Sequence, residues 1–300
     1  MFDVIVVGAR CAGAPTAMPA VHLERATLGG IKLEYEVRGA GEPVVLIHAG
    51  VCADWFRPMM DEPALARRYR LVRYHRAGYA GSGRVAGPLD VAGNAAHCLA
   101  LLRHLGIERA HVVGHSSGAN MGLQLALDAP DMVQSLALLE TALLAVPSGP
   151  YAGQAIERYR AGDRAAAVHT FMRGVCGDGY RETLERALPG AFGGAVADAD
   201  TFFGQELPAL REWPFGPEEA SRLRAPALVV LGGDSHKVTP RFEQRHALLL
   251  AWLPDAEPFT LPGAIHLLHL QNPGGMAGAL VAFFERHPLP KAQGSTAGRA

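Results

Sequence analysis

Residues 110–127 read AHVVGHSSGANMGLQLAL, and this stretch decides the fold. An apolar run at 110–113 leads into Gly114-His115-Ser116-Ser117-Gly118, and an apolar helical pattern follows. In a Gly-x-Ser-x-Gly turn between a strand and a helix, the serine hydroxyl projects above the sheet and the glycines leave room for the backbone. Chance produces on the order of 0.1 such matches in a chain with 8 serines and 35 glycines, so the strand and helix on either side make the match informative. We therefore predict that Ser116 is a nucleophile.

Strand and helix patterns alternate on both sides of this turn. A strand with alternating apolar and polar residues comes first, and the later strands are continuous apolar runs, as in strands buried on both faces of a parallel sheet. The predicted strands lie at 31–37, 44–47, 69–74, 110–113, 133–139, 226–231 and 257–261, and the predicted helices at 55–67, 89–105, 117–127, 241–252 and 274–286. This order predicts an α/β fold with a mostly parallel sheet and helices on both faces.

The predicted core is interrupted once. Between residues 145 and 224 strand patterns give way to helical stretches separated by Gly and Pro, which predicts an inserted helical cap. The two parts of the core are expected at 18–144 and 225–288, and a frayed polar tail at 289–300.

Residues 1–17 resemble the start of a flavoprotein, because a short apolar strand enters a Gly-rich turn. Arg10 breaks the G-x-G-x-x-G pattern, and Pro15 and Pro19 interrupt the helix that should follow. We expect a stray extension here, which argues against an FAD-dependent oxidoreductase.

Composition excludes several classes of function. The net charge of -1 offers no basic surface for nucleic acid. The four cysteines are far apart without a C-x-x-C pair, which argues against a zinc site or a disulfide framework and favours a reducing compartment. No apolar run reaches the roughly 18 residues of a membrane span, and the start of the chain is a poor signal peptide. We expect a cytoplasmic protein that uses no cofactor or metal and acts on a small molecule, with no prediction of its oligomeric state.

A serine nucleophile needs a histidine base that a carboxylate orients. Asp234 follows the next-to-last strand in a Gly-Gly-Asp turn, and His266 follows the last strand. Both are expected at the edge where open α/β sheets bind ligands, and in the chain order that this turn requires. We predict Asp234 as the orienting acid and His266 as the base. Glu140, at the end of another strand, is the alternative acid, and His269 is the alternative base.

The developing oxyanion needs two backbone N–H donors. Ser117 follows the nucleophile and Gly50 lies in the loop after an early strand, so we expect these two donors, with Val51 as the neighbouring candidate. His48 is expected to order the loop and His115 to pack within the turn. The residues expected to line the substrate pocket are His48, Val51, Phe203 and Trp213. The cap residues Met172, Phe192, Phe202, Phe203, Trp213 and Phe215 indicate an apolar acyl or ring-bearing substrate.

Five motifs follow one another along the chain: LIHAG (46–50), RYHRAGYAGSG (73–83), GHSSG (114–118), GGD (232–234) and GAIHLLHLQNP (263–273). Together they resemble the bacterial α/β-hydrolase superfamily, in particular its esterase, enol-lactonase and cofactor-free haloperoxidase-like branches. The resemblance spans about residues 28–287 and implies the α/β-hydrolase fold. Two departures stand out. Ala49 replaces the usual glycine after His48, and His75 replaces an aspartate, which leaves the hydrogen bonds of that loop open.

A serine at position 116 favours acyl chemistry over the dehalogenase and epoxide-hydrolase reactions, which related families run through a carboxylate nucleophile. The predicted function is a carboxylic-ester-type hydrolase that attacks an ester, lactone or thioester through an acyl-enzyme. A perhydrolase or acyltransferase would use the same residues with another acceptor. A non-catalytic ligand-binding homologue is a further alternative, and it would lack a member of the triad.

Overall fold

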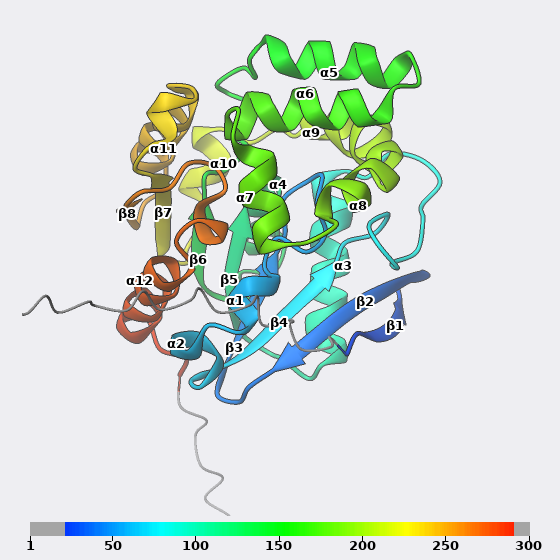
Figure 1. The fold of residues 1–300 in the computed structure, drawn as a ribbon. Helices are drawn as coiled ribbons and strands as arrows, with labels where there is room; N and C mark the ends of the chain where they lie inside the picture. The colour runs from blue at the N-terminus through cyan, green and yellow to red at the C-terminus, as the bar shows by residue number, and fades with distance from the viewer. Residues whose placement is uncertain (1–21, 291–300) are drawn as a thin grey trace, which may run out of the picture.

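The computed structural model describes residues 22–290, which form one eight-stranded sheet with helices on both faces and a helical cap at one end (Figure 1). The strand order is β1-β2-β4-β3-β5-β6-β7-β8; β1 and β2 run antiparallel to their neighbours, and the remaining pairs are parallel. The strands are β1 (Glu24–Leu28), β2 (Ile31–Arg38), β3 (Glu42–Ile47), β4 (Tyr69–His75), β5 (Ala110–His115), β6 (Val133–Leu139), β7 (Ala227–Gly232) and β8 (Ala256–Leu261).

Helices cover the two faces of the sheet in separate groups. The helices α3, α4 and α11 bury their apolar sides in one hydrophobic cluster, whereas α1, α2 and α12 pack into a second cluster on the other face. The core helices are α1 (Arg57–Met60), α2 (Pro63–Ala66), α3 (Val91–His104), α4 (Ser117–Asp128), α11 (Arg241–Trp252) and α12 (Pro273–Arg286). The predicted α/β architecture is therefore confirmed.

A helical insertion between β6 and β7 forms the cap, as predicted, and Figure 1 shows its helices grouped at one end of the sheet. Its apolar side packs against the loop after β3 in a third hydrophobic cluster. The insertion contains α5 (Pro150–Arg160), α6 (Arg164–Cys176), α7 (Tyr180–Ala187), α8 (Ala191–Ala197), a π-helical segment (Asp200–Glu206), α9 (Leu207–Arg211) and α10 (Pro217–Ser221).

One local prediction was wrong. The single helix expected at 55–67 is two short helices, because Pro63 disfavours helical geometry at Glu62, whose ψ is 115°. Although β2 alternates apolar and polar residues, its two acids Glu34 and Glu36 are both buried. Arginines make this burial tolerable: Arg25 and Arg73 pair with the two carboxylates at 2.5 and 2.6 Å.

Within residues 22–290 no helix has the length and apolar character to cross a membrane. In the same range, no three His, Cys, Asp or Glu side chains gather as a metal site would require. The extension predicted at 1–17 and nearly all of the tail predicted at 289–300 lie outside the described residues. The other domain boundaries remain predictions.

Candidate active site

Ser116 stands on the turn between β5 and α4. Its backbone has φ 53° and ψ -118°, a conformation that non-glycine residues rarely adopt and that costs on the order of 1–3 kcal/mol. The flanking glycines permit the turn. A Cβ at Gly114 would lie 2.5 Å from the Gly118 carbonyl oxygen, and one at Gly118 would lie 2.1 Å from the Ile47 carbonyl oxygen. The chain thus holds Ser116 in a strained position at the carboxyl end of the sheet.

Ser116 and His266 line one cavity between the sheet and the cap. The cavity has a volume of ≈ 50 Å³, which corresponds to roughly three to five water molecules. Most of the lining is apolar and comes from the cap and the loop after β3. The lining residues are Ala49, Gly50, Val51, Trp55, Ser116, Ser117, Ala142, Leu144, Ser148, Tyr151, Phe171, Met172, Val175, Cys176, Phe202, Leu207, Leu210, Phe242, Arg245 and His266.

The His266 imidazole is fixed on three sides. Its Nδ1 lies 2.7 Å from Oε2 of Glu140, and its ring stacks on Phe242 with centroids 4.5 Å apart. The ring of His115 packs against it at 4.7 Å, and Nε2 of His115 lies 3.0 Å from the His266 carbonyl oxygen. Burial lowers the pKa of His115 well below its ordinary value, so that ring is neutral and donates to the carbonyl. With Nδ1 on the carboxylate, Nε2 of His266 is left for chemistry.

Glu140 follows β6 directly, and its side chain is fully buried. Its Oε1 accepts hydrogen bonds from the Gly232 backbone at 2.8 Å and from the Ser235 hydroxyl at 2.5 Å, while Oε2 accepts from His266. A buried carboxylate is stable when such donors surround it. Glu140, which the sequence offered as the alternative acid, is therefore the carboxylate that contacts the His266 imidazole.

Asp234 does not reach the imidazole, contrary to the first expectation. Its side chain is 37% exposed and pairs with Lys237 at 2.8 Å. The backbone explains the orientation: the Asp234 N–H donates to the Ala264 carbonyl, and a short 3-10 helix starts at Ser235. The β7 loop thus turns Ser235 inward to Glu140 and leaves Asp234 facing solvent.

The two predicted oxyanion donors lie beside Ser116, and both line the cavity. Ser117 is the first residue of α4, where backbone N–H groups lack partners within the helix. The Gly50 N–H donates to the Ser117 hydroxyl at 2.9 Å, and a Cβ at Gly50 would lie 2.4 Å from the Phe202 ring. Val51, the neighbouring candidate, lines the same cavity with φ 73°.

A buried ion pair between core and cap lies behind these donors. Glu206, in the π-helical segment, accepts from Ser117 Oγ at 2.7 Å, from Tyr79 Oη at 2.5 Å and from Arg76 Nη2 at 3.1 Å. Burial acts to lower the pKa of Arg76, but the Glu206 carboxylate outweighs it and the pKa is raised. Glu206 was not predicted from the sequence; it lies in a π-helical segment, and such segments often accompany functional sites.

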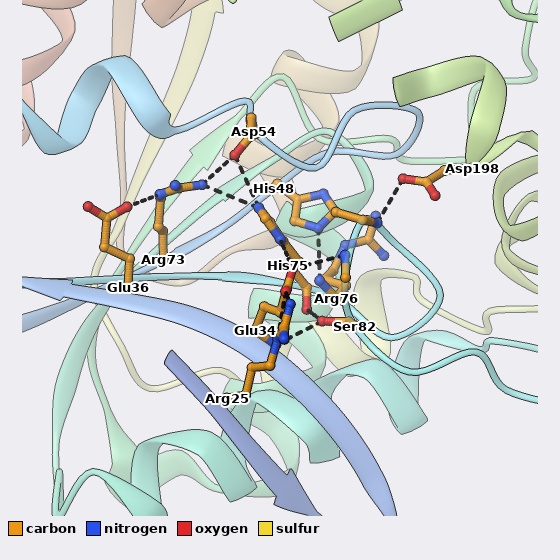
Figure 2. A network of polar contacts seen from close by, with 12 residues as sticks. Arg25, Glu34, Glu36, His48, Asp54, Arg73, His75, Arg76, Ser82 and Asp198 are labelled. Atoms are coloured by element: carbon orange, nitrogen blue, oxygen red, sulfur yellow. Dashed lines mark hydrogen bonds and ion pairs between the residues drawn. The ribbon is translucent and has the colours of Figure 1, made fainter. Parts of the chain in front are cut away.

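The loop at 73–83 keeps its support despite the histidine in place of an aspartate. Figure 2 shows His75 between two carboxylates: Nδ1 lies 3.1 Å from Glu34 Oε2, and Nε2 lies 3.1 Å from Asp54 Oδ1. Glu34 also accepts from the Gly81 backbone at 2.9 Å, and Ser82 donates to the His75 carbonyl oxygen. Burial favours a raised pKa for Asp54, but His75 and Arg73 outweigh it and hold the pKa well below its usual range. Glu34 thus supplies the carboxylate that the resemblance assigns to position 75.

Several of the remaining predicted residues do not line the cavity. His48 was expected in the pocket, but it is absent from the lining, and its Nε2 accepts from the Arg76 backbone at 3.0 Å. His269 stacks on Phe56, and its Nε2 lies 2.8 Å from the Trp55 carbonyl oxygen, so the alternative base is engaged elsewhere. Phe203 and Trp213 were expected in the pocket, but neither lines the cavity: Phe203 stacks on Tyr159, and Trp213 donates to Gln124.

Two cavity residues on α11 escaped the sequence analysis. Phe242 and Arg245 are both buried and both line the cavity. Their spacing of three residues places them on one face of the helix, which is the signal that could have found them.

A mostly parallel sheet, a serine on a strained strand-to-helix turn and a helical cap above it define the α/β-hydrolase class. Residues 42–186 match the family model described as alpha/beta hydrolase fold. The chain belongs to the α/β-hydrolase superfamily.

Individual relatives match this chain over limited lengths or at low identity. "Putative carbamate hydrolase RutD" of Azorhizobium caulinodans is 39% identical over 112 residues, which are 37% of this chain and 42% of that protein. The dihydrolipoyllysine-residue acetyltransferase component of the acetoin cleaving system of Pseudomonas putida is 29% identical over 88% of this chain and 70% of its own. A thermophilic esterase from Thermogutta terrifontis has a TM-score of 0.75 at 19% identity, over 89% of this chain and all of that chain. The chain therefore spans less than half of the first relative, and the esterase supports the fold alone.

Proposed function

We propose that this chain is a serine hydrolase that cleaves an ester, lactone or thioester through an acyl-enzyme on Ser116. The observation that carries the proposal is the 2.7 Å contact between His266 Nδ1 and the buried Glu140, in a cavity that Ser116 shares. The carboxylate holds the imidazole in the tautomer whose Nε2 can accept a proton. The assignment replaces Asp234 by Glu140 as the orienting acid.

In the proposed reaction Ser116 Oγ attacks the carbonyl carbon and its proton passes to His266 Nε2. The negative charge that develops on the carbonyl oxygen is stabilised by the backbone N–H groups of Ser117 and Gly50. Because an oxyanion is a stronger acceptor than a hydroxyl, it takes the Gly50 donor over from Ser117 Oγ. His266 then protonates the leaving group, and a water that it activates hydrolyses the acyl-enzyme.

The cavity supports a small substrate. A volume of ≈ 50 Å³ beneath Phe171, Met172 and Phe202 leaves room for a short acyl chain. Of the apolar acyl and ring-bearing substrates expected from the sequence, the ring-bearing one is therefore not part of the proposal.

The test is turnover of p-nitrophenyl acetate and butyrate by the wild type and by Ser116→Ala. Removing the nucleophile should lower kcat on the order of 10⁶-fold. Ser221→Ala, which changes an exposed serine on α10, is the matched control and should keep wild-type rates. Phenylmethylsulfonyl fluoride should add its sulfonyl mass to the wild type and not to Ser116→Ala. Unchanged turnover or labelling in Ser116→Ala would refute the proposal.

Acyl transfer is a second candidate, favoured by the similarity to an acetyltransferase component over 88% of this chain. It would use the same acyl-enzyme with another acceptor than water. Adding an alcohol, an amine or a thiol during turnover and measuring the ratio of acylated acceptor to free acid separates the two reactions.

A further inference from the structure

Arg245 is a buried cation in the wall of the proposed catalytic cavity. It stands on α11 one turn after Phe242, the residue that stacks on His266, and it is 6% exposed. Its Nη2 donates to the Val146 carbonyl oxygen at 3.1 Å, and its buried Nε has no hydrogen-bond partner. Among residues 22–290 no carboxylate lies within ion-pair distance of this guanidinium.

The charged groups around Arg245 do not neutralise the positive charge of its guanidinium. Glu140 is the acid that affects it, but both Glu140 oxygens already accept hydrogen bonds from other donors. Arg241, one turn earlier on α11, adds a second positive charge, and Tyr151 is a phenol whose pKa burial raises. Burial lowers the pKa of Arg245, because Tyr151 and Glu140 do not offset its desolvation and the charge of Arg241.

A second buried arginine near the site, Arg76, shows the surroundings that a structural arginine has. Arg76 also lies within the fold, but the Glu206 carboxylate pairs with it at 3.0 Å and raises its pKa. Burying a cation is costly unless an anion and hydrogen bonds accompany it. At Arg76 the chain supplies the anion. At Arg245 the described part of the chain supplies no anion, and the residue lines the proposed substrate cavity.

We propose that Arg245 binds a negatively charged oxygen on the acyl part of the substrate, a carboxylate above all. This inference rests on the proposed function and names its substrate class: esters, lactones or thioesters of short acids that carry a second carboxylate. The acyl part is the relevant one, because it remains on Ser116 and has to fit the small cavity. The planar fork of the guanidinium matches a carboxylate with two parallel hydrogen bonds.

The test compares two substrates of equal length, mono-p-nitrophenyl glutarate and its methyl ester, with rates corrected for spontaneous hydrolysis. The wild type should favour the anionic ester in kcat/KM by at least about tenfold, which is the effect of a hydrogen bond to a charged group. Arg245→Met should lower the ratio of anionic to neutral kcat/KM about 10- to 100-fold. Arg245→Lys keeps the charge without the fork and should retain part of the preference.

Arg241→Met is the matched control. The Arg241 guanidinium donates to Thr239 and to the Pro147 carbonyl oxygen and does not line the cavity, so this change should leave the ratio unaltered. A wild type without preference for the anionic ester would overturn the proposal. So would an Arg245→Met variant that turns over both esters with an unchanged ratio.

Binding separates failure of this inference from failure of the proposed hydrolase. If the wild type cleaves neither ester, the proposed function is wrong, and calorimetry with monomethyl glutarate, which keeps one carboxylate, and dimethyl glutarate, which has none, decides the remaining question. Tighter binding of monomethyl glutarate by the wild type, lost in Arg245→Met and kept in Arg241→Met, supports the anion site. Equal binding of both compounds, or none, contradicts it.

Discussion

The loops after β6 and β7 begin at neighbouring strands and each carries an acid, but the two acids have opposite surroundings. Glu140, after β6, is fully buried and contacts His266. Asp234, after β7, is 37% exposed and pairs with Lys237. The same sheet edge therefore presents one carboxylate to the imidazole and the other to solvent.

The two loops therefore make different contributions to the same buried carboxylate. The β6 loop provides the charge, and the β7 loop provides the hydrogen bonds that hold it, from the Gly232 backbone and the Ser235 hydroxyl. Glu140 reaches the site from a backbone with φ 41°, a strained conformation of the kind found at functional positions. A second buried acid from the β7 loop would repel Glu140, so the exposed position of Asp234 is consistent with the role assigned to Glu140.

The largest loss of activity is expected for Glu140→Gln. The amide no longer holds His266 in the required tautomer, so kcat on p-nitrophenyl acetate should fall about 10⁴-fold. Stopped-flow and long-time absorbance measurements cover that range. Circular dichroism checks that the variant is folded.

Asp234→Asn is the matched change on the other loop. An exposed ion pair contributes little, so kcat should stay within about twofold of the wild type. The assignment of the acid is wrong if Asp234→Asn abolishes turnover while Glu140→Gln retains it.

Ser235→Ala should lower activity by a smaller factor and tests the support that the β7 loop gives to Glu140. It removes one of two hydrogen bonds to Glu140 Oε1 and leaves the bond from Gly232 in place. A hydrogen bond to a charged group is worth about 1.5–3 kcal/mol, so we expect kcat/KM to fall roughly tenfold. Ser221→Ala again serves as the control, and equal rates in both variants would show that the β7 loop does not support the acid.

The fold and two members of the proposed triad could be predicted because they depend on local patterns. Ser116 is marked by glycines at fixed spacing between a strand and a helix, and His266 by its place after the last strand. Glu140 and Asp234 both follow strands at the same sheet edge, so chain order does not separate them. Their roles depend on which side chain loses water and which donors meet it, and that is a property of packing.

Arg245 and Glu206 were beyond the sequence analysis for a related reason. Both lie in helical segments, where a charged residue usually faces water. The spacing from Phe242 places Arg245 on the same face of α11, but nothing in the sequence around Glu206 marks it as buried. The role proposed for Arg245 depends on its place in the cavity wall, and the structural role of Glu206 depends on its ion pair with Arg76. The two short helices at 57–66 show the opposite case, since Pro63 was visible in the sequence and decided the break.

The central claim is that Glu140, and not Asp234, holds the proton on His266 Nδ1. Proton NMR tests this directly, because a buried imidazole N–H that donates to a carboxylate exchanges slowly and resonates far downfield. The account predicts such a signal in the wild type and in Asp234→Asn, and its loss in Glu140→Gln. A signal that persists in Glu140→Gln and disappears in Asp234→Asn would contradict the account.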